Sequence, residues 1–539
     1  GSVGVTLRYD VPERVTELRP TLPERATVTG TDGFGRAEGR TYEWDGETAA
    51  ASITVDLAVN ETADRVGPEA AGGRYLFVDA GEWALVQRPA VPTEWAWRGP
   101  EPVGVERAAT TAGPGAAGEW MAYLGATETY ERQAHGQHFR LVVPERATLA
   151  ESPSAILDSL SRASDQLRVG DRDDEVTAFA APTTTVEWGV RGLQYGDTDM
   201  WVRDAERLDT AENTWLHEYV HARQDYETAA DARWTTEAFA TYYAGLLALE
   251  QNRTEFDALQ RLLARGSADP QASAVLTEPA TWRNAANYWK GSLVAGELDR
   301  QTRLATDSGR SLQAVFSAMN AHQDPVDAET VLSAVETTAG PDARETAARL
   351  TTAETVPDVW SRSAHLEAFG EAPARIAVGF AEAPFAASGP YRNATVAATD
   401  SARREPTVAL YAGETLTVTG RAENVGEAAG EYQVRFGVDG RVVDSASGSL
   451  QPGDAATHTF ARTFATAGER VVSVGAEEVT VSVREPAQAT VTGLAANRTT
   501  ISGGGAVELT ATVENSYDVP AVANLSLSGE MGTVFDRRV

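Results

Sequence analysis

Residues 209–243 read DTAENTWLHEYVHARQDYETAADARWTTEAFATYY, and the central part of the chain is organised around them. Asp209 followed three residues later by Glu212 is the pattern of a helix N-cap with an acid at the third helical position. The apolar residues that follow recur at helical spacing, so the segment predicts a helix that starts at Asp209. In such a helix His217 and His221 lie four positions apart and share one face.

The sequence His217-Glu-Tyr-Val-His221 has the spacing of the HExxH metal-binding motif. Two imidazoles at positions i and i+4 can bind one metal ion, and Glu218 lies close enough to take a proton from a nearby water. A surface helix with two histidines is the alternative that this pattern leaves open. We expect a zinc site with Glu218 as the general base.

A catalytic zinc ion takes three protein ligands, so a third must come from another segment. Glu237 is the best candidate, because it lies near the start of a second amphipathic helix expected from Trp234 to about Gln251. Fifteen residues separate His221 from Glu237, which is enough for the chain to turn and return antiparallel. An acid favoured in the first turn by the helix dipole is the alternative, and the two roles are compatible.

The residues around these candidates resemble a known enzyme family. Trp234-Thr-Thr-Glu237-Ala-Phe-Ala, after an HExxH helix, is similar to the W-x-x-E-G-F-A segment of the gluzincin metallopeptidases. The stretch 287–300, NYWKGSLVAGELDR, resembles the Y-x-K-G-x-L-V-A-x-x-L-D segment of the glycyl aminopeptidase family. It resembles more loosely the Y-E-K-G segment of the aminopeptidase N and leukotriene A4 hydrolase family. The resemblance covers about residues 180–320 and implies a thermolysin-like catalytic domain with Zn²⁺ held by His217, His221 and Glu237.

The resemblance also implies two further elements of the site. Tyr288 corresponds to the hydroxyl that stabilises the oxyanion together with zinc, although a core aromatic at helical spacing is the alternative. The relatives carry a strand whose acid binds the free amino group of the substrate, and its equivalent here is Gly192-Leu193-Gln194. A neutral Gln194 cannot form an ion pair with an ammonium group, so the sequence slightly favours an endopeptidase over an aminopeptidase.

Composition restricts the partners. The chain of 539 residues has a formal net charge of −32 and a sequence pI of about 4.6, which argues against nucleic acid or an anionic membrane as partner. Such an excess of acids is typical of a halophilic protein. Lys290 is the only lysine, and there is no cysteine, so no disulfide or thiolate site is expected. No apolar run of about 18 residues is present, and therefore no membrane span is expected within the sequence.

Periodicity predicts a multidomain α+β chain. Residues 1–139 alternate apolar and polar in short runs, which predicts a β-rich N-terminal domain. Residues 140–368 are expected to form the thermolysin-like zinc peptidase domain, with a strand over 186–194 that leads to the zinc helix and helices from 209 to about 365.

After about residue 370 the sequence is rich in Val, Thr, Gly and Ala, and Asp439-Gly440 predicts a type I′ hairpin. Similar segments end at Asn424 and at Asn515, 91 positions apart, which is the size of one small β-sandwich. We therefore expect an Ig-like sandwich over 369–486 and a second, incomplete Ig-like module over 487–539. Both resemble the adhesion-type modules of prokaryotic surface proteins, and we expect the natural chain to continue, up to a C-terminal membrane anchor.

These observations predict an extracellular or surface-attached zinc metallopeptidase that acts on peptide or protein substrates. Five sequons permit glycosylation outside the cell: Asn60, Asn252, Asn393, Asn497 and Asn524. The alternative is a surface adhesion or scaffold protein with a catalytically idle zinc domain. The intact Glu218 favours the enzyme, because an idle site has no need of a base.

Overall fold

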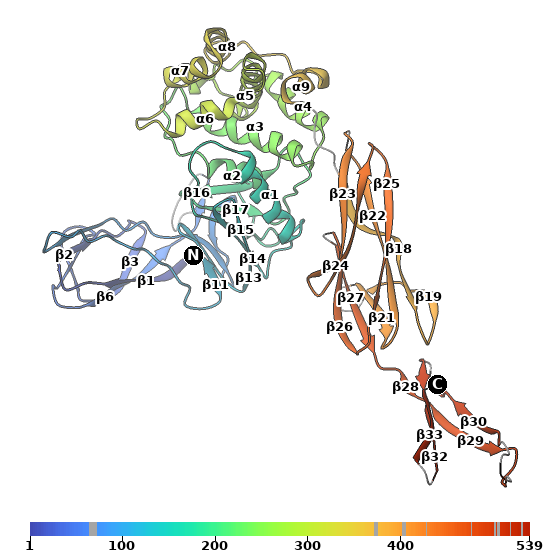
Figure 1. Ribbon diagram of the computed structural model, residues 1–539. Helices are drawn as coiled ribbons and strands as arrows, with labels where there is room; N and C mark the ends of the chain where they lie inside the picture. The colour runs from blue at the N-terminus through green and yellow to red at the C-terminus, as the bar shows by residue number, and fades with distance from the viewer. Residues whose placement is uncertain are drawn as a thin grey trace. The chain divides into compact units, whose positions relative to one another are not determined.

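The computed structural model consists of two compact units, Gly1–Glu371 and Ala372–Val539 (Figure 1). The structure describes residues 1–63, 73–370, 376–400, 406–426, 428–475, 477–500, 503, 507–517, 519–529 and 532–538. A helix that crosses a membrane needs about 20 apolar residues. Among these described residues, no helix combines such a length with such hydrophobicity.

The first unit begins with a β-rich region, as expected. Strands β1 (Ser2–Asp10), β6 (Ala50–Ala58) and β3 (Ala26–Asp32) pair in that order, and β6 buries every second residue, as a half-buried strand must. A second sheet has the order β11-β12-β9-β8-β7. Its strands are β7 (Glu61–Thr62), β8 (Tyr75–Asp79), β9 (Ala84–Gln87), β11 (Gly115–Ala117) and β12 (Met121–Leu124). Shorter pairs join β2 (Val15–Pro20) to β10 (Thr93–Trp97) and β4 (Phe34–Arg36) to β5 (Tyr42–Trp44).

A five-stranded sheet carries the site, in the order β13-β14-β15-β17-β16. Its strands are β13 (Thr127–Ala134), β14 (Gln137–Pro144), β15 (Glu175–Ala181), β16 (Gly192–Tyr195) and β17 (Asp199–Arg203). Strands β14, β15 and β17 are parallel, whereas β16 is antiparallel and lies at the edge. The expected domain boundary at 139/140 falls inside β14. The buried Asp199 on β17 accepts backbone N–H bonds from Trp120 and Met121, which joins the β-rich region to this sheet.

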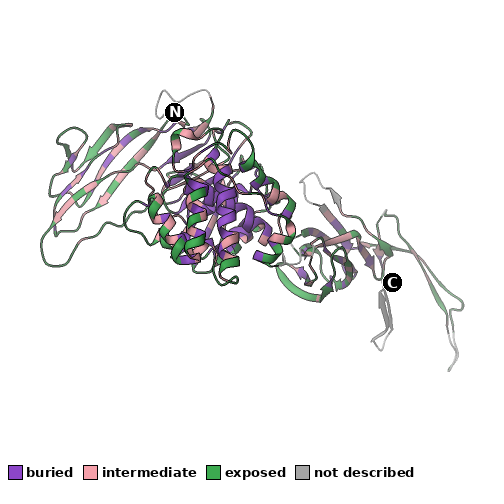
Figure 2. Ribbon diagram, turned by 90° about the horizontal axis from the view of Figure 1, so that it is seen from above, coloured by how far each residue is buried: buried purple, intermediate pink, exposed green. Residues whose placement is uncertain are grey.

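Helices form the rest of the first unit, and Figure 2 shows that many of their residues are buried. Helix α1 (Pro153–Gln166) precedes β15, and the others follow β17. They are α2 (Thr214–His221), α3 (Trp234–Glu250), α4 (Phe256–Ala264), α5 (Ala286–Ala305), α6 (Leu312–Asn320), α7 (Ala328–Ala339), α8 (Pro341–Thr351) and α9 (Arg362–Phe369). The helical stretch expected from the sequence is confirmed. Helix α3 is buried on almost every side, because α2 and α5 both pack against it.

Two sequence expectations near the site are wrong. The zinc helix does not start at Asp209: Asn213 caps α2 by accepting the Leu216 N–H at 3.1 Å. Of the expected strand 186–194 only the last three residues are in a strand, β16, which spans Gly192–Tyr195. Trp188 is instead buried, with its indole donating to the Pro182 carbonyl, and a bridge to Tyr75 holds this segment outside the sheet.

The second unit contains two sheets whose inner faces share one apolar core. Their orders are β19-β18-β22-β25 and β20-β21-β27-β26-β23-β24. The strands are β18 (Ile376–Ser388), β19 (Asn393–Thr395), β20 (Thr399–Asp400), β21 (Pro406–Tyr411), β22 (Thr415–Asn424), β23 (Gly430–Val438), β24 (Arg441–Leu450), β25 (Ala455–Thr463), β26 (Gly468–Val474) and β27 (Glu477–Arg484). Asp439 and Gly440 have φ values of 51° and 73°, so the expected tight hairpin between β23 and β24 is confirmed.

The described residues after Arg484 form three pairs of strands, β28-β31, β29-β30 and β32-β33. These strands are β28 (Ala487–Gln488), β29 (Thr490–Ala496), β30 (Leu509–Glu514), β31 (Ala521–Val522), β32 (Asn524–Gly529) and β33 (Gly532–Arg538). The repeat seen in the sequence has a structural counterpart. The side chains of Asn424 and Asn515 each accept the N–H two residues on and donate to the carbonyl four residues on.

Candidate metal centre and cleft

Helix α2 is held rigidly, because most of its side chains are buried. Trp215 donates its indole N–H to the Glu206 carbonyl at 3.2 Å, and Tyr219 donates its hydroxyl to Gln137 at 2.8 Å. These contacts fix the rotation of the helix about its axis. His217 and His221 are thereby turned to the opposite side, toward α3.

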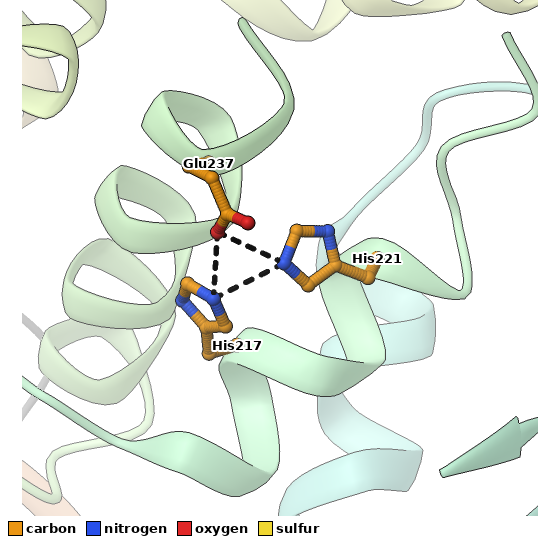
Figure 3. Close-up of side chains that lie close together, drawn as sticks. All are labelled: His217, His221 and Glu237. Atoms are coloured by element: carbon orange, nitrogen blue, oxygen red, sulfur yellow. Dashed lines mark hydrogen bonds and ion pairs between the residues drawn. The ribbon is translucent and has the colours of Figure 1, made fainter. Parts of the chain in front are cut away.

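Helix α3 brings Glu237 to the two histidines (Figure 3). The Nε2 atoms of His217 and His221 lie 3.1 Å apart, and each lies 3.3 Å from Oε2 of Glu237. A tetrahedral zinc ion with bonds of about 2.0 Å places its ligand atoms about 3.3 Å from one another. The three atoms therefore have the spacing of one face of a zinc coordination tetrahedron.

The chemistry of these atoms also fits a cation. Oε2 of Glu237 is buried, and its neighbours at 3.3 Å are the two imidazole Nε2 atoms. Burial disfavours a charge on His221, but the hydrogen bond and charge of Glu237 and the charge of Glu218 outweigh it and raise the pKa of His221 to about 9. The site therefore favours positive charge between the three atoms. Within the part of the chain that the structure describes, these residues are the one cluster with metal-ligand spacing.

Gln224 fixes the ring of His221. Its Oε1 lies 2.8 Å from Nδ1 of His221, and its Nε2 donates to the Thr236 carbonyl at 2.8 Å. An amide oxygen only accepts, so Nδ1 carries the proton and Nε2 keeps its lone pair for a metal. Gln224 is not among the site residues predicted from the sequence, although its position three residues after His221 is a usable signal.

Glu218 lies beside the three ligand atoms and is 5% exposed. Burial raises the pKa of Glu218 above its ordinary value, against the lowering effect of the two histidines. Its Oε2 accepts the backbone N–H of Gln194 at 2.8 Å, which ties the carboxylate to the edge strand β16. A Cβ at Gly192 would lie 2.7 Å from Oε1 of Glu218, so only glycine allows this close approach.

The strand Gly192-Leu193-Gln194 therefore lies at the site, but the Gln194 side chain does not reach into it. Its amide nitrogen donates to the carbonyl of Gly196, inside the turn between β16 and β17. Trp120 packs against Gly196, where a Cβ would meet the indole ring. The part of Gln194 that serves the site is its backbone N–H.

Tyr288 lies in the first turn of α5 with its ring parallel to that of His217, at 3° and a centroid distance of 6.1 Å. Burial and the neighbouring Glu237 raise the pKa of Tyr288 well above its ordinary value, so its hydroxyl remains a hydrogen-bond donor. The sequence-derived candidates His217, Glu218, Glu237 and Tyr288 thus meet in one place.

These residues line a cleft of about 550 Å³ between β16, α2, α3 and α5. Glu212, at the entrance to α2, is a further acid on its wall. Arg265 pairs with Glu212 at 2.6 Å, and Arg191 lies 3.5 Å from it. Arg265 also stacks over Trp289, another residue of the cleft wall, at 4.7 Å. Glu212 is therefore paired chiefly with Arg265, because Arg191 donates two hydrogen bonds to Glu206 and approaches Glu212 less closely. The sequence did not reveal this network.

Comparisons with known proteins give only distant structural similarities. No protein-family model matches this chain, and no curated protein matches it. An aminopeptidase N family protein from Idiomarina loihiensis is 13% identical with a TM-score of 0.45, over 71% of this chain and 77% of that one. An M1 zinc metallopeptidase from Deinococcus radiodurans is 17% identical with a TM-score of 0.40, over 66% of this chain and 91% of that one. At these values the assignment of the site rests on its own geometry.

Proposed function

We propose that this chain is a zinc-dependent peptidase that hydrolyses peptide bonds. The observation that carries the proposal is the triangle formed by His217 Nε2, His221 Nε2 and Glu237 Oε2, with the buried Glu218 beside it. When bound, zinc supplies Lewis acidity that polarises a carbonyl and lowers the pKa of water to about 7. The adhesion alternative would require neither a base at Glu218 nor a cleft at the metal centre.

The residues of the chain divide the remaining work. The Gln194 N–H holds Oε2 of Glu218, which leaves Oε1 to accept the proton of the attacking water and later pass it to the leaving amine. The hydroxyl of Tyr288 donates a hydrogen bond to the oxyanion. The outer edge of β16 pairs with an extended substrate backbone, which gives main-chain hydrogen bonds without much sequence preference.

We favour internal cleavage over removal of single N-terminal residues. An aminopeptidase needs an unpaired acid for the substrate ammonium, and two features argue against one here. Gln194 is neutral and its side chain bonds Gly196, while Glu212 is engaged by Arg191 and Arg265. The cleft accordingly offers a peptide backbone no free carboxylate beyond Glu218 and Glu237 among the residues described along its walls.

The environment of the protein is a second part of the proposal. A net charge of −32 supports a halophilic protein, and the exposed sequons at Asn393 and Asn497 support an extracellular one. Asn60 is unsuited to glycosylation in the folded chain, because its buried side chain accepts the Asp79 N–H. We further propose that the second unit contains Ig-like modules that hold the peptidase at a surface.

Mass spectrometry of a peptide mixture, half of it N-acetylated, tests the function in molar salt with zinc-loaded protein. We expect internal cuts in blocked and free peptides. Glu218→Gln should keep zinc and lose turnover, because an amide cannot accept the water proton. Glu414→Gln, which changes a buried acid of the second unit paired with Arg392, is the matched control and should leave turnover intact.

Each other outcome contradicts a specific part of the proposal. An intact mixture would exclude the peptidase and leave the adhesion alternative. Loss of single residues from free ends alone would mean that another group binds the ammonium. Substantial turnover by Glu218→Gln would exclude Glu218 as the base.

A further inference from the structure

The single lysine of the chain is fully buried on α5, two residues after Tyr288. Its Nζ donates to three backbone carbonyls, those of Ala272 at 3.2 Å, Ala274 at 2.5 Å and Ala353 at 3.1 Å. Two of these carbonyls belong to the loop that leads into α5, and the third follows α8. One side chain therefore joins three segments.

The three carbonyls require an ammonium group. Lysine has three N–H donors on one atom, and each finds an acceptor here. An apolar residue would leave one buried and two partly buried carbonyls without this donor, which is costly. Arginine spreads its donors over a planar fork. The buried Arg223 illustrates this, since two separate nitrogens of its guanidinium reach the carbonyls of Leu167, Gly170 and Asp171.

The loop held by Lys290 determines where α5 begins. Ala285 occupies the N-cap of α5, and its methyl side chain cannot accept a hydrogen bond from the first turn. Asn284 and Ala285 both have positive φ, at 47° and 58°. Asparagine adopts this conformation readily, but an alanine does so only when its surroundings impose it. The loop is braced by Thr281, whose hydroxyl accepts the Val275 N–H at 2.9 Å.

Tyr288 and Lys290 point in different directions from this turn. Residues two positions apart on an α-helix are separated by about 200° around its axis. Tyr288 lines the cleft, while Lys290 is anchored on the other side of α5. Movement of the first turn would therefore displace the Tyr288 hydroxyl, whereas His217, His221 and Glu237 are carried by α2 and α3.

We propose that Lys290 is a positioning residue that holds the first turn of α5 so that the Tyr288 hydroxyl meets the oxyanion. The inference rests on the proposed peptidase function, because it assigns Lys290 a role in the same reaction. A positioning role differs from a packing role in one respect. If Lys290 positions Tyr288, its substitution lowers kcat only when the Tyr288 hydroxyl is present.

A double-mutant cycle tests this coupling. Lys290→Arg should lower kcat about tenfold or more, with unchanged zinc content and little change in KM, because a small displacement of a catalytic group is costly. In a Tyr288→Phe background the same substitution should change kcat less than about twofold. Gln251→Met is the matched control, since Gln251 is buried and bonded to Ser159 at the far end of α3. Its effect should be equal in both backgrounds.

Hydrogen exchange provides a readout that needs no activity. Lys290→Arg should accelerate exchange over residues 282–290 and leave α2 unchanged. An unchanged exchange rate over 282–290 would mean that Lys290 does not hold this turn. Equal effects of Lys290→Arg on kcat with Tyr288 and with Phe at position 288 would mean that Lys290 does not position the Tyr288 hydroxyl. If the wild type has no peptidase activity but Lys290→Arg still accelerates exchange, the proposed peptidase function is excluded, and the role of Lys290 in holding the turn is not. If the lysine variant does not fold, Thr281→Val loosens the same loop and replaces it in the cycle with the same expectations.

Discussion

Substitution of Gln224 by methionine should weaken zinc binding without removing a ligand. Gln224 accepts a hydrogen bond from Nδ1–H of His221 and donates one to the carbonyl of Thr236, the residue before Glu237. It therefore joins the helix that carries the histidines to the helix that carries the acid. Methionine has a similar length and makes neither hydrogen bond.

The expected magnitude follows from these two contacts. Loss of a hydrogen-bonding partner of a metal-bound histidine typically lowers metal affinity by about 10- to 100-fold. That range corresponds to about 1.4 to 2.7 kcal/mol. We expect the upper half of it, because His221 becomes free to turn and the link to α3 is lost in the same variant.

Equilibrium competition with a chromogenic chelator measures this change in the zinc dissociation constant directly. Gln313→Met is the matched control: Gln313 accepts the Arg168 N–H and donates to the Gln166 carbonyl, and it contacts none of the proposed ligands. It should bind zinc as the wild type does. Wild-type affinity in Gln224→Met would refute the argument that Gln224 orients His221.

Three further outcomes are expected. Tyr288→Phe should lower kcat about 10²-fold at constant zinc content, by analogy with the loss of one oxyanion donor, and a change of only a few-fold would return Tyr288 to a packing role. Gly192→Ala would place a Cβ 2.7 Å from Oε1 of Glu218 and 2.8 Å from the Thr214 methyl. Because this displaces Glu218, the turnover rate should fall about 10²-fold while zinc is retained. A normal turnover rate would contradict the close approach of Gly192 to Glu218. Burial lowers the pKa of Lys290 from 10.5 to about 8, so the unfolded chain binds more protons between these values and stability should rise with pH there. Between about pH 7.5 and 9.5 the free energy of unfolding of the wild type, measured with denaturant, should rise by about 2 kcal/mol relative to that of Lys290→Met. The same pH dependence in both proteins would contradict the lowered pKa of Lys290.

Local sequence spacing predicted that His217, His221 and Glu237 lie together because the relation between the two histidines is local. The i and i+4 positions of His217 and His221 fix their relation within one helix, and α3 begins at Trp234 as expected. The end of α3 at Glu250 also lies within one residue of its expected position. For α2 and α3, the helical spacing of apolar residues in the sequence agrees with their burial in one shared core, so the sequence alone places these helices well.

The remaining features depend on contacts between distant segments. Glu212 resembles a capping acid in the sequence, but its carboxylate pairs with Arg265, 53 residues away, and Asn213 caps the helix instead. The Gln194 side chain turns to Gly196, where Trp120 from the β-rich region packs, and no local pattern encodes that contact. Lys290 was noticeable as the only lysine, yet its three acceptors come from segments that only the fold brings together.

The burial of Lys290 has a practical consequence for chemical labelling. Reagents that acylate or alkylate primary amines find, in the folded chain, only the α-amino group, because the one ε-amino group has no exposed surface. A second label on the chain therefore reports that the loop before α5 has opened. The protein thus contains a single-site chemical reporter of that opening, which can be followed by intact mass in concentrated salt without introducing a probe.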